Sequence, residues 1–519
     1  MKSESPALVA VIGAGPGGIG AAMMLRKAGI DDVVIFERSD EVGGSWHVND
    51  YPGIGVDVPA FTYQYSFAKN PNWSRLFPKG AEVLRYHQQV ARDGGLYDHI
   101  RFGTNIVREK WDANTHMWVL TTTSGETFTA RFVINAIGAY INPKADPGIA
   151  GYNTFAGKIL RPVGWDHTYD LKNKRVGIVG TGASSVQITP AIGGECSKLV
   201  VFQRTPVWCL PKPDATFGPV LARLFRHPSA QSTVSTGALW LIEIATHALV
   251  YTPPVVAQPV IRLLDRAAQV AYRIYLRAVV DDEATRKALM PHYGALGKRP
   301  TLSNEFLQAF NRDEVELVST AIESIDHTGI NTADGSHYDL DALVLATGYE
   351  LFSDPEAYRV GTVVGENGFD LAEFYNAQGL QAYQSVAVHG LPNRWTLIGP
   401  YSWTGTGWHF MVETAATHAI RAIREAERRR TTRVEVTLEA MNAYHQLIRR
   451  RGRNIDFYFR TLNKGIRTYY VNSHGDTPYI RPSTVLEAQR DANSYPLGDY
   501  TWQQLPTNSS PTTEKATRT

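Results

Sequence analysis

The sequence is poor in cysteine. Its 519 residues contain only Cys196 and Cys209, and neither lies in a Cys-x-x-Cys pair. Two separated cysteines exclude a disulfide framework, a cysteine-based zinc site and a dithiol redox centre, and we predict no metal. This usage is typical of the reducing cytosol. Residues 1–7 lead directly into the first predicted strand, which leaves no room for a signal peptide, so we expect a cytoplasmic protein.

The sequence also lacks an excess of charge and a long hydrophobic run. Its 52 basic and 50 acidic residues are interspersed and leave a net charge of +2, which argues against a nucleic-acid or membrane-surface partner. The most apolar run, Ala238 to Val250, carries Glu243 and His247 and precedes a Pro-Pro pair. We expect it to be too short and too polar to span a bilayer, and to form a core or surface helix. Small molecules are the expected partners.

The stretch from Leu8 to Glu37 has the pattern of a βαβ dinucleotide-binding unit. A buried strand is followed by a glycine turn, a helix and a second strand; the turn contains Gly13, Gly15 and Gly18. These glycines allow a tight turn, close approach of the backbone to a pyrophosphate, and close packing of helix on strand. The pyrophosphate would lie at the helix N-terminus. Glu37 ends the second strand, where it would accept hydrogen bonds from an adenosine ribose.

The same pattern returns at Arg175. A strand leads to Gly180 and Gly182, with Ser185 in place of the third glycine, and the second strand ends at Arg204. The first glycine is 24 positions from the terminal charged residue in both units. A carboxylate at this end suits a ribose diol, whereas an arginine would pair with a 2′-phosphate. We therefore predict FAD in the first unit, NADP(H) in the second, and hydride transfer from NADPH to FAD.

The remaining segments complete a predicted α/β fold with two Rossmann-like dinucleotide-binding domains, for FAD and NADP, and a helical insertion. An antiparallel hairpin is expected within 101–130, helices within 217–290, strands at 315–319 and 340–347, and a helix over 411–428. The expected limits are residues 1–145 and 386–504 for the FAD domain, 146–215 and 293–385 for the NADP domain, 216–292 for the insertion, and 505–519 for a disordered tail.

The segment between the two units carries a further motif. FAGKILRPVGWD, at 155–166, resembles the fingerprint of Baeyer–Villiger monooxygenases, FxGxxxHxxxW followed by Pro or Asp. Phe155, Gly157, Trp165 and Asp166 match, and Arg161 replaces the histidine. Other blocks similar to that family follow in family order, from about Leu8 to Arg428: Gly43, Gly44 and Trp46 in GGSWHVNDYPG; Asp57 and Tyr63 in VDVPAFTYQYSF; Arg204 and Thr205 in VFQRTP; Lys298 and Arg299 in GKRP; and Ala346–Tyr349 in ATGY.

The resemblance implies an activity. In such enzymes FAD reduced by NADPH adds O2 at C4a, and the peroxyflavin anion attacks a ketone to give an ester or lactone. By similarity, Arg299 and Asp57 are the catalytic residues: Arg299 is the cation that keeps the peroxide deprotonated, and Asp57 orients it. Lys298 would join Arg204 and Thr205 on the 2′-phosphate. The other expected cofactor contacts are Gly44, Ser45, Trp46, Tyr63 and Val107 for FAD, and Thr181, Gly182, Ser184 and Gln187 for NADP.

Arg161 is a departure from the family pattern. Arginine cannot accept a hydrogen bond or titrate near neutral pH. We therefore expect the fold and NADPH oxidation to survive, with coupling to oxygenation in question.

Three readings of the function stay open at this point. The first is a ketone-oxidising monooxygenase. The second is a flavin monooxygenase that oxygenates nitrogen or sulfur. The third is an NADPH:acceptor reductase or an inactive nucleotide-binding partner protein. Retention of Arg299 and Asp57 favours the first. The substrate and the choice between monomer and dimer are not legible from the sequence.

Overall fold

The computed structural model describes residues 5–405 and 407–505. Its larger sheet has the strand order β17-β4-β5-β6-β1-β2-β3, and β18 also pairs with β6. Strands β1, β2, β3, β6 and β18 are mutually parallel, whereas β4, β5 and β6 form the expected antiparallel meander. The bounds are β1 (Ala7–Ile12), β2 (Val33–Phe36), β3 (Ile100–Arg101), β4 (Ile106–Asp112), β5 (Met117–Thr122), β6 (Thr127–Asn135), β17 (Val363–Val364) and β18 (Arg394–Thr396).

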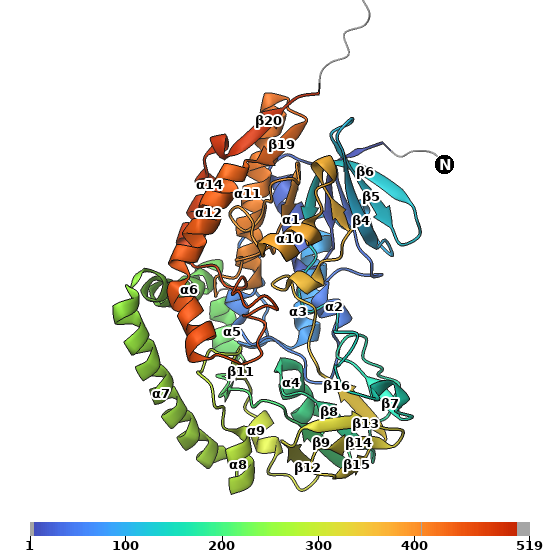
Figure 1. Cartoon of the computed structure of the whole chain (residues 1–519), viewed down its shortest axis with the longest axis vertical. Helices are drawn as coiled ribbons and strands as arrows, with labels where there is room; N and C mark the ends of the chain where they lie inside the picture. The colour runs from blue at the N-terminus through green and yellow to red at the C-terminus, as the bar shows by residue number, and fades with distance from the viewer. Residues whose placement is uncertain (1–4, 406, 506–519) are drawn as a thin grey trace, which may run out of the picture.

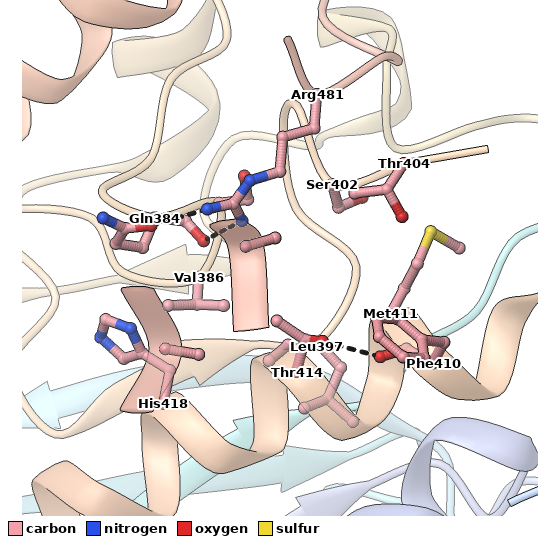
Figure 2. A pocket seen from close by; sticks show the side chains of 14 residues that line it. Gln384, Val386, Leu397, Ser402, Thr404, Phe410, Met411, Thr414, His418 and Arg481 are labelled. Carbon is pink, nitrogen blue, oxygen red and sulfur yellow. Dashed lines mark hydrogen bonds between the residues drawn. The ribbon is translucent and has the colours of Figure 1, made fainter. Parts of the chain in front are cut away.

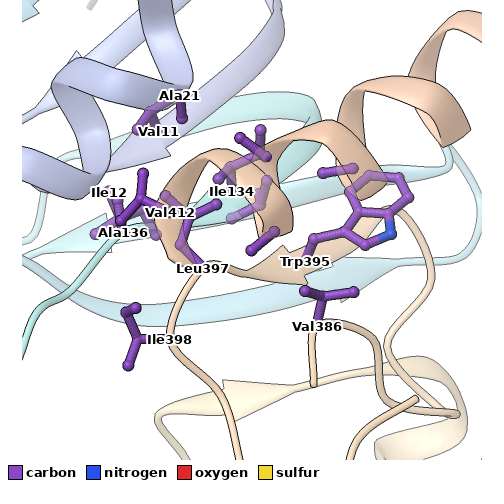
Figure 3. Packing of buried hydrophobic residues seen from close by; sticks show 14 of the residues in the cluster. Val11, Ile12, Ala21, Ile134, Ala136, Val386, Trp395, Leu397, Ile398 and Val412 are labelled. Carbon is purple, nitrogen blue, oxygen red and sulfur yellow. The ribbon is translucent and has the colours of Figure 1, made fainter. Parts of the chain in front are cut away.

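Two helices that are far apart in sequence pack on this sheet. They are α1 (Pro16–Lys27) and α11 (Trp408–Arg429), which contact each other (Figure 1). Figure 3 shows the core between them and the sheet, where Val11 and Ile134 from the strands meet Leu397 and Val412. The N-terminal and C-terminal parts of the chain therefore share one hydrophobic core, as the two-part FAD domain requires.

The second sheet is fully parallel, with the order β12-β9-β8-β16-β7. Its residues alternate between two faces. Val176 and Ile178 pack toward the helices, whereas Val179 packs toward a small antiparallel sheet of β13, β14 and β15. The bounds are β7 (Lys158–Leu160), β8 (Arg175–Val179), β9 (Lys198–Phe202), β12 (Val315–Val318), β13 (Ile322–Ile325), β14 (Gly329–Thr332), β15 (His337–Asp339), β16 (Ala342–Leu345), α4 (Ala183–Ile192) and α9 (Phe306–Ala309).

The insertion between the halves of the second domain is helical, as expected. It comprises α5 (Pro219–Phe225), α6 (Pro228–Tyr251), α7 (Pro254–Val279) and α8 (Glu283–Leu289), and α7 runs along the outer edge of the molecule (Figure 1). Helix α6 is longer than the apolar run suggests because it begins at Pro228. Among the described residues it is the one helix with the length and hydropathy of a membrane span, and only 6% of its most apolar window is buried. The expectation that it is too short to span a bilayer is therefore wrong, and of the two expected helix types it is a surface helix.

The chain returns to the first domain earlier than the expected limit at residue 386. Strand β17 already pairs with β4, so residues after β16 extend the first sheet. The tail expected over 505–519 lies outside the described residues from 506 onward. The remaining elements are α2 (Ser45–Val48), η1 (Ala60–Thr62), α3 (Gly80–Asp93), η2 (Tyr97–His99), η3 (Tyr152–Thr154), β10 (Cys209–Leu210), β11 (Thr301–Leu302), η4 (Pro355–Ala357), η5 (Glu366–Gly368), α10 (Leu371–Gln378), β19 (Arg433–Val436), α12 (Leu438–Arg451), α13 (Arg453–Asp456), η6 (Phe457–Leu462), α14 (Val485–Ser494), η7 (Leu497–Asp499) and β20 (Tyr500–Gln503).

Candidate active site

The first glycine turn has a backbone that only glycine fits. Gly13 has φ +103°, and a Cβ on it would lie 3.2 Å from the carbonyl oxygen of Ala136. A Cβ on Gly18 would lie 1.8 Å from the oxygen of Gly13. Gly15 is the N-cap of helix α1, and no side chain caps this N-terminus. No side chain therefore occupies the N–H groups at the start of α1, and they can bind an anion. The turn fits the pyrophosphate of a dinucleotide.

Glu37 is buried beside this turn. Its Oε2 accepts a hydrogen bond from the N–H of Ala14 at 2.7 Å, and its Oε1 accepts one from Ser39 at 2.9 Å. Gly44 also approaches the turn, because a Cβ on it would lie 2.8 Å from the Cα of Gly15. Val107 is at the start of β4, three residues after Thr104, whose N–H donates to the carbonyl oxygen of Glu37. Their contacts with FAD stay predictions.

The second turn repeats this geometry. Gly180 has φ +105°, and a Cβ there would lie 2.7 Å from the oxygen of Ala346. Gly182 is the N-cap of α4, again without a side-chain cap. Thr181 donates its hydroxyl to the carbonyl oxygen of Thr205 at 2.9 Å, which fixes the turn against the end of β9. Ser185, in the third glycine position, is fully buried. A second dinucleotide turn is therefore present.

Arg204 and Lys298 interact electrostatically although 94 positions separate them in sequence. Burial and the positive charge of Arg204 lower the pKa of Lys298 to about 8. Within the described part of the chain, neither forms an ion pair with a carboxylate. Two neighbouring cations without a counter-charge, at the end of β9, fit a dianionic phosphate.

Arg299 and Asp57 form an ion pair, with 2.6 Å between Nη2 and Oδ1. Burial alone would lower the pKa of Arg299, but the Asp57 carboxylate and the tyrosines around it hold that pKa well above its usual value. Two of these tyrosines are Tyr140 and Tyr479, whose hydroxyl oxygens lie 3.1 Å apart. The guanidinium is thus a fixed cation in a largely aromatic setting.

Trp46 and Tyr63 adjoin this pair. The indole Nε1 of Trp46 donates to the hydroxyl of Tyr63 at 2.9 Å, and the two rings meet edge-on. Burial raises the pKa of Tyr63, which feels the charges of Asp57 and Arg299. Ser45, the first residue of α2, accepts a hydrogen bond from Asn49 at its carbonyl oxygen. The aromatic residues expected near FAD therefore gather around the ion pair.

Gln187 joins the two domains instead of being left free for a nucleotide. Its Oε1 accepts from the hydroxyl of Tyr51 at 2.9 Å, and its Nε2 donates to the carbonyl oxygen of Gly55 at 3.0 Å. Ser184 interacts with the hydroxyls of Tyr51 and Tyr349. Tyr51 was missed in the sequence, where the only signal was its place in the aromatic loop after Glu37.

The fingerprint segment also links the domains. Val163 bridges to Asn49, and the N–H of Trp165 donates to the carboxylate of Asp50. Arg161 donates to the carbonyl oxygens of Lys144 and Ala145, at 3.2 and 3.4 Å. Arg161 thus holds the segment between β6 and β7 through hydrogen bonds in which it is only the donor.

A pocket that no expected site residue lines opens beside α11. Figure 2 shows it between α11 and the segment that precedes it, with Phe410 and Met411 on one side and Arg481 on the other. Arg481 donates to Oε1 of Gln384 at 2.7 Å. Among the described residues, no group of His, Cys, Asp and Glu side chains is arranged to hold a metal ion.

Comparison with known proteins places this geometry in a family. Residues 10–217 match the family of pyridine nucleotide-disulphide oxidoreductases. A Baeyer–Villiger monooxygenase from Streptomyces coelicolor is 34% identical over 496 residues, covering 95% of this chain and 92% of that protein. Another from Pseudomonas aeruginosa is 33% identical and covers 85% and 82%.

Solved structures agree in fold. A steroid monooxygenase bound to NADP superposes with a TM-score of 0.80 at 26% identity, over 96% of this chain and all of that one. OTEMO in complex with FAD and NADP gives a TM-score of 0.81 at 25% identity over the same shares. The α/β fold with two dinucleotide-binding domains is thereby confirmed. The chain belongs to the Baeyer–Villiger monooxygenase family.

Proposed function

We propose that this enzyme uses NADPH, FAD and O2 to insert one oxygen atom next to the carbonyl of a small-molecule ketone, giving an ester or lactone. The observation that carries the proposal is the Arg299–Asp57 ion pair, with 2.6 Å between the charged groups, in a chain with two glycine turns. When bound, FAD accepts hydride from NADPH and activates O2.

The first glycine turn would hold FAD. The N–H groups at the start of α1 would bind its pyrophosphate, and Glu37 would accept hydrogen bonds from its ribose. Glu37 can do so without leaving its place, because a carboxylate oxygen has more than one acceptor site. Other residues proposed to contact FAD are Gly44, Ser45, Trp46, Asp57, Tyr63 and Val107.

The second turn would hold NADPH. Lys298 and Arg204 would pair with the 2′-phosphate, with Thr205 beside them, because their mutual repulsion is relieved when a dianion lies between them. Thr181, Gly182 and Ser184 would line the pyrophosphate. Gln187 would act on the nucleotide mainly by holding the Tyr51 loop in place.

Arg299 would stabilise the negative charge that develops on oxygen during transfer to the ketone. It keeps its proton at any pH at which the protein folds. At about 4 Å and an effective dielectric near 20, one such charge is worth roughly 4 kcal/mol. Asp57 would fix the direction of the guanidinium. Oxygenation of nitrogen or sulfur does not need this cation, so the ion pair favours ketones.

The proposal is tested with the FAD-loaded enzyme, NADPH, labelled O2 and a panel of linear, cyclic and steroidal ketones. We expect an ester or lactone that contains one labelled oxygen atom. Arg299→Gln should keep its flavin and oxidise NADPH but lose product formation, whereas Arg428→Gln, at an exposed ion pair on α11, should match the parent. Product without label, or full activity of Arg299→Gln, would refute the proposal.

A further inference from the structure

The helical insertion presents an apolar surface to solvent. Of the 21 large hydrophobic side chains that are exposed among the described residues, 15 lie between Pro219 and Val279. Soluble monomers rarely expose an apolar patch of more than a few hundred Å² unless it binds something. We call the exposed sides of α6 and α7 the insertion face. Figure 1 shows α7 at the outer edge of the molecule, away from both sheets.

Six exposed apolar residues of α7 form a single stripe, and a seventh, Val255, lies outside it at the start of the helix. At about 3.6 residues per turn, the six fall within an arc of roughly 120°. The stripe consists of Val256, Val260, Leu263, Leu264, Val270 and Ile274, each 49–66% exposed. The opposite side holds Tyr272 and Leu276, which are buried in the second domain. Helix α7 is therefore apolar on its buried side and apolar again on its solvent side.

A row of arginines borders this stripe. Arg262, Arg266, Arg273 and Arg277 are exposed and follow one flank of the helix. The acidic residue of α7, Asp265, is turned inward, where it accepts hydrogen bonds from the hydroxyl of Tyr458 and the N–H of Ala295. The solvent side of α7 thus combines apolar side chains with positive charge. Long basic side chains next to an apolar stripe can reach lipid headgroups while the stripe enters the acyl region.

Helix α6 also exposes apolar side chains. Trp240, Leu241 and Ile244 are 54–72% exposed on one side of it. Its acidic residue, Glu243, is turned toward the protein, where it accepts a hydrogen bond from the N–H of Val485 at 2.8 Å. The aromatic and aliphatic residues on its outer side suit the interface of a bilayer, where tryptophan is enriched.

Contacts along its inner side tie α6 to the rest of the molecule. Ser235 donates to the carbonyl oxygen of Phe61 at 2.5 Å, and Asn454 donates to the oxygens of Leu249 and Thr252. Crossing a bilayer would break these bonds, so α6 would lie on the membrane instead of spanning it. Phe61 belongs to η1, between Asp57 and Tyr63, so the inner side of α6 contacts a segment of the candidate active site.

We infer that the insertion face docks this enzyme on an anionic lipid bilayer. An isologous dimer through the same face with its two α7 helices antiparallel would bring the arginine rows of two copies together, and like charges across an interface oppose association. An anionic membrane instead complements the row, because anionic headgroups attract basic residues near the surface. The arginine row beside the apolar stripe therefore favours an anionic lipid surface over a second copy of the chain.

The inference is tested by sedimentation of the FAD-loaded full chain with vesicles of phosphatidylcholine, with and without phosphatidylglycerol. We expect binding to the anionic vesicles that weakens as salt is raised. Leu263→Glu should lower the partition coefficient about tenfold or more, because a leucine that would enter the bilayer is lost and a negative charge is added next to anionic lipid. Val360→Glu makes the same kind of change at a distant exposed valine and should bind as the parent does.

Each remaining outcome decides the matter. Flavin content and NADPH oxidation in solution should be equal in the parent and Leu263→Glu, which excludes misfolding. Quenching by brominated lipids that is lost in Trp240→Phe would place α6 at the bilayer. A parent that does not sediment with anionic vesicles overturns the inference. A dimer that Leu263→Glu dissociates, without vesicle binding, also overturns it and assigns the face to a second copy.

Discussion

Replacing Lys298 by alanine tests how the second turn selects its nucleotide. Lys298 and Arg204 are close enough that burial and mutual repulsion bring the pKa of Lys298 to about 8. A charge-assisted hydrogen bond to a phosphate is worth about 1.5–3 kcal/mol. The KM for NADPH should therefore rise about 10–150-fold in Lys298→Ala. The KM for NADH, which lacks the 2′-phosphate, should stay nearly unchanged.

The same pKa predicts a dependence on pH. With a pKa of about 8, the protonated fraction of Lys298 falls from about nine-tenths at pH 7 to about one-tenth at pH 9. The KM for NADPH in the parent enzyme should rise about tenfold over that interval. Lys298→Arg should remove this rise, because arginine stays protonated. Initial rates of reduced-nicotinamide oxidation with saturating ketone measure both effects.

A matched control lies on β9 itself. Lys198 forms an exposed ion pair with Glu316, and Lys198→Ala should leave both KM values as they are. The reasoning fails if Lys298→Ala keeps the parent ratio of NADPH to NADH preference, or if the parent shows no change in KM between neutral and alkaline pH.

Three other changes probe the remaining parts of the structure. Gly18→Ala should purify with much less flavin, because its Cβ would meet the oxygen of Gly13 at 1.8 Å. Gly498→Ala, whose Cβ would have no atom within 4 Å, should keep its flavin. Equal flavin-to-protein absorbance ratios in the two variants would contradict this prediction. Burial lowers the pKa of His87 to about 4, whereas the unfolded chain accepts this proton below about pH 6.5. The free energy of unfolding should therefore decrease as the pH is lowered from about 6.5 to 4, by up to about 1.4 kcal/mol per pH unit. Urea unfolding at a series of pH values should show that the free energy of unfolding depends less on pH in His87→Gln. An unchanged dependence on pH would assign the effect to other groups. Arg161→His should raise the amount of ester formed per NADPH consumed, since a histidine can also accept a hydrogen bond; an unchanged ratio would show that the departure is neutral.

The sequence predicted those features that depend on neighbouring residues. Both glycine turns, their flanking strands and the meander after β3 were legible because turn chemistry and hydrophobic alternation act over short distances. Arg299 and Asp57 are 242 positions apart, and only the resemblance to a family joined them. The hydroxyl contact of Tyr140 with Tyr479 had no local signal, since tertiary packing alone brings the two together.

The helical insertion shows the other limit. Periodicity identified its helices but did not tell which side of α6 or α7 would be covered, because both sides are apolar. The early return through β17 was missed for a related reason, since a two-residue strand carries almost no pattern. Both glycine turns have the expected geometry, and the contacts of the residues around them with cofactors stay predictions.

The split of the first domain has a consequence for synthesis on the ribosome. Strand β18 and helix α11 complete the sheet and add a large part of the core that β1 and α1 begin, and β19 and α12 add to that core later still. The second domain has all strands of its parallel sheet once β16 at Leu345 has been made. Domains fold as units during translation. The nicotinamide half should therefore mature first, while the flavin half waits, unfinished and exposed to chaperones, for a helix that ends at Arg429.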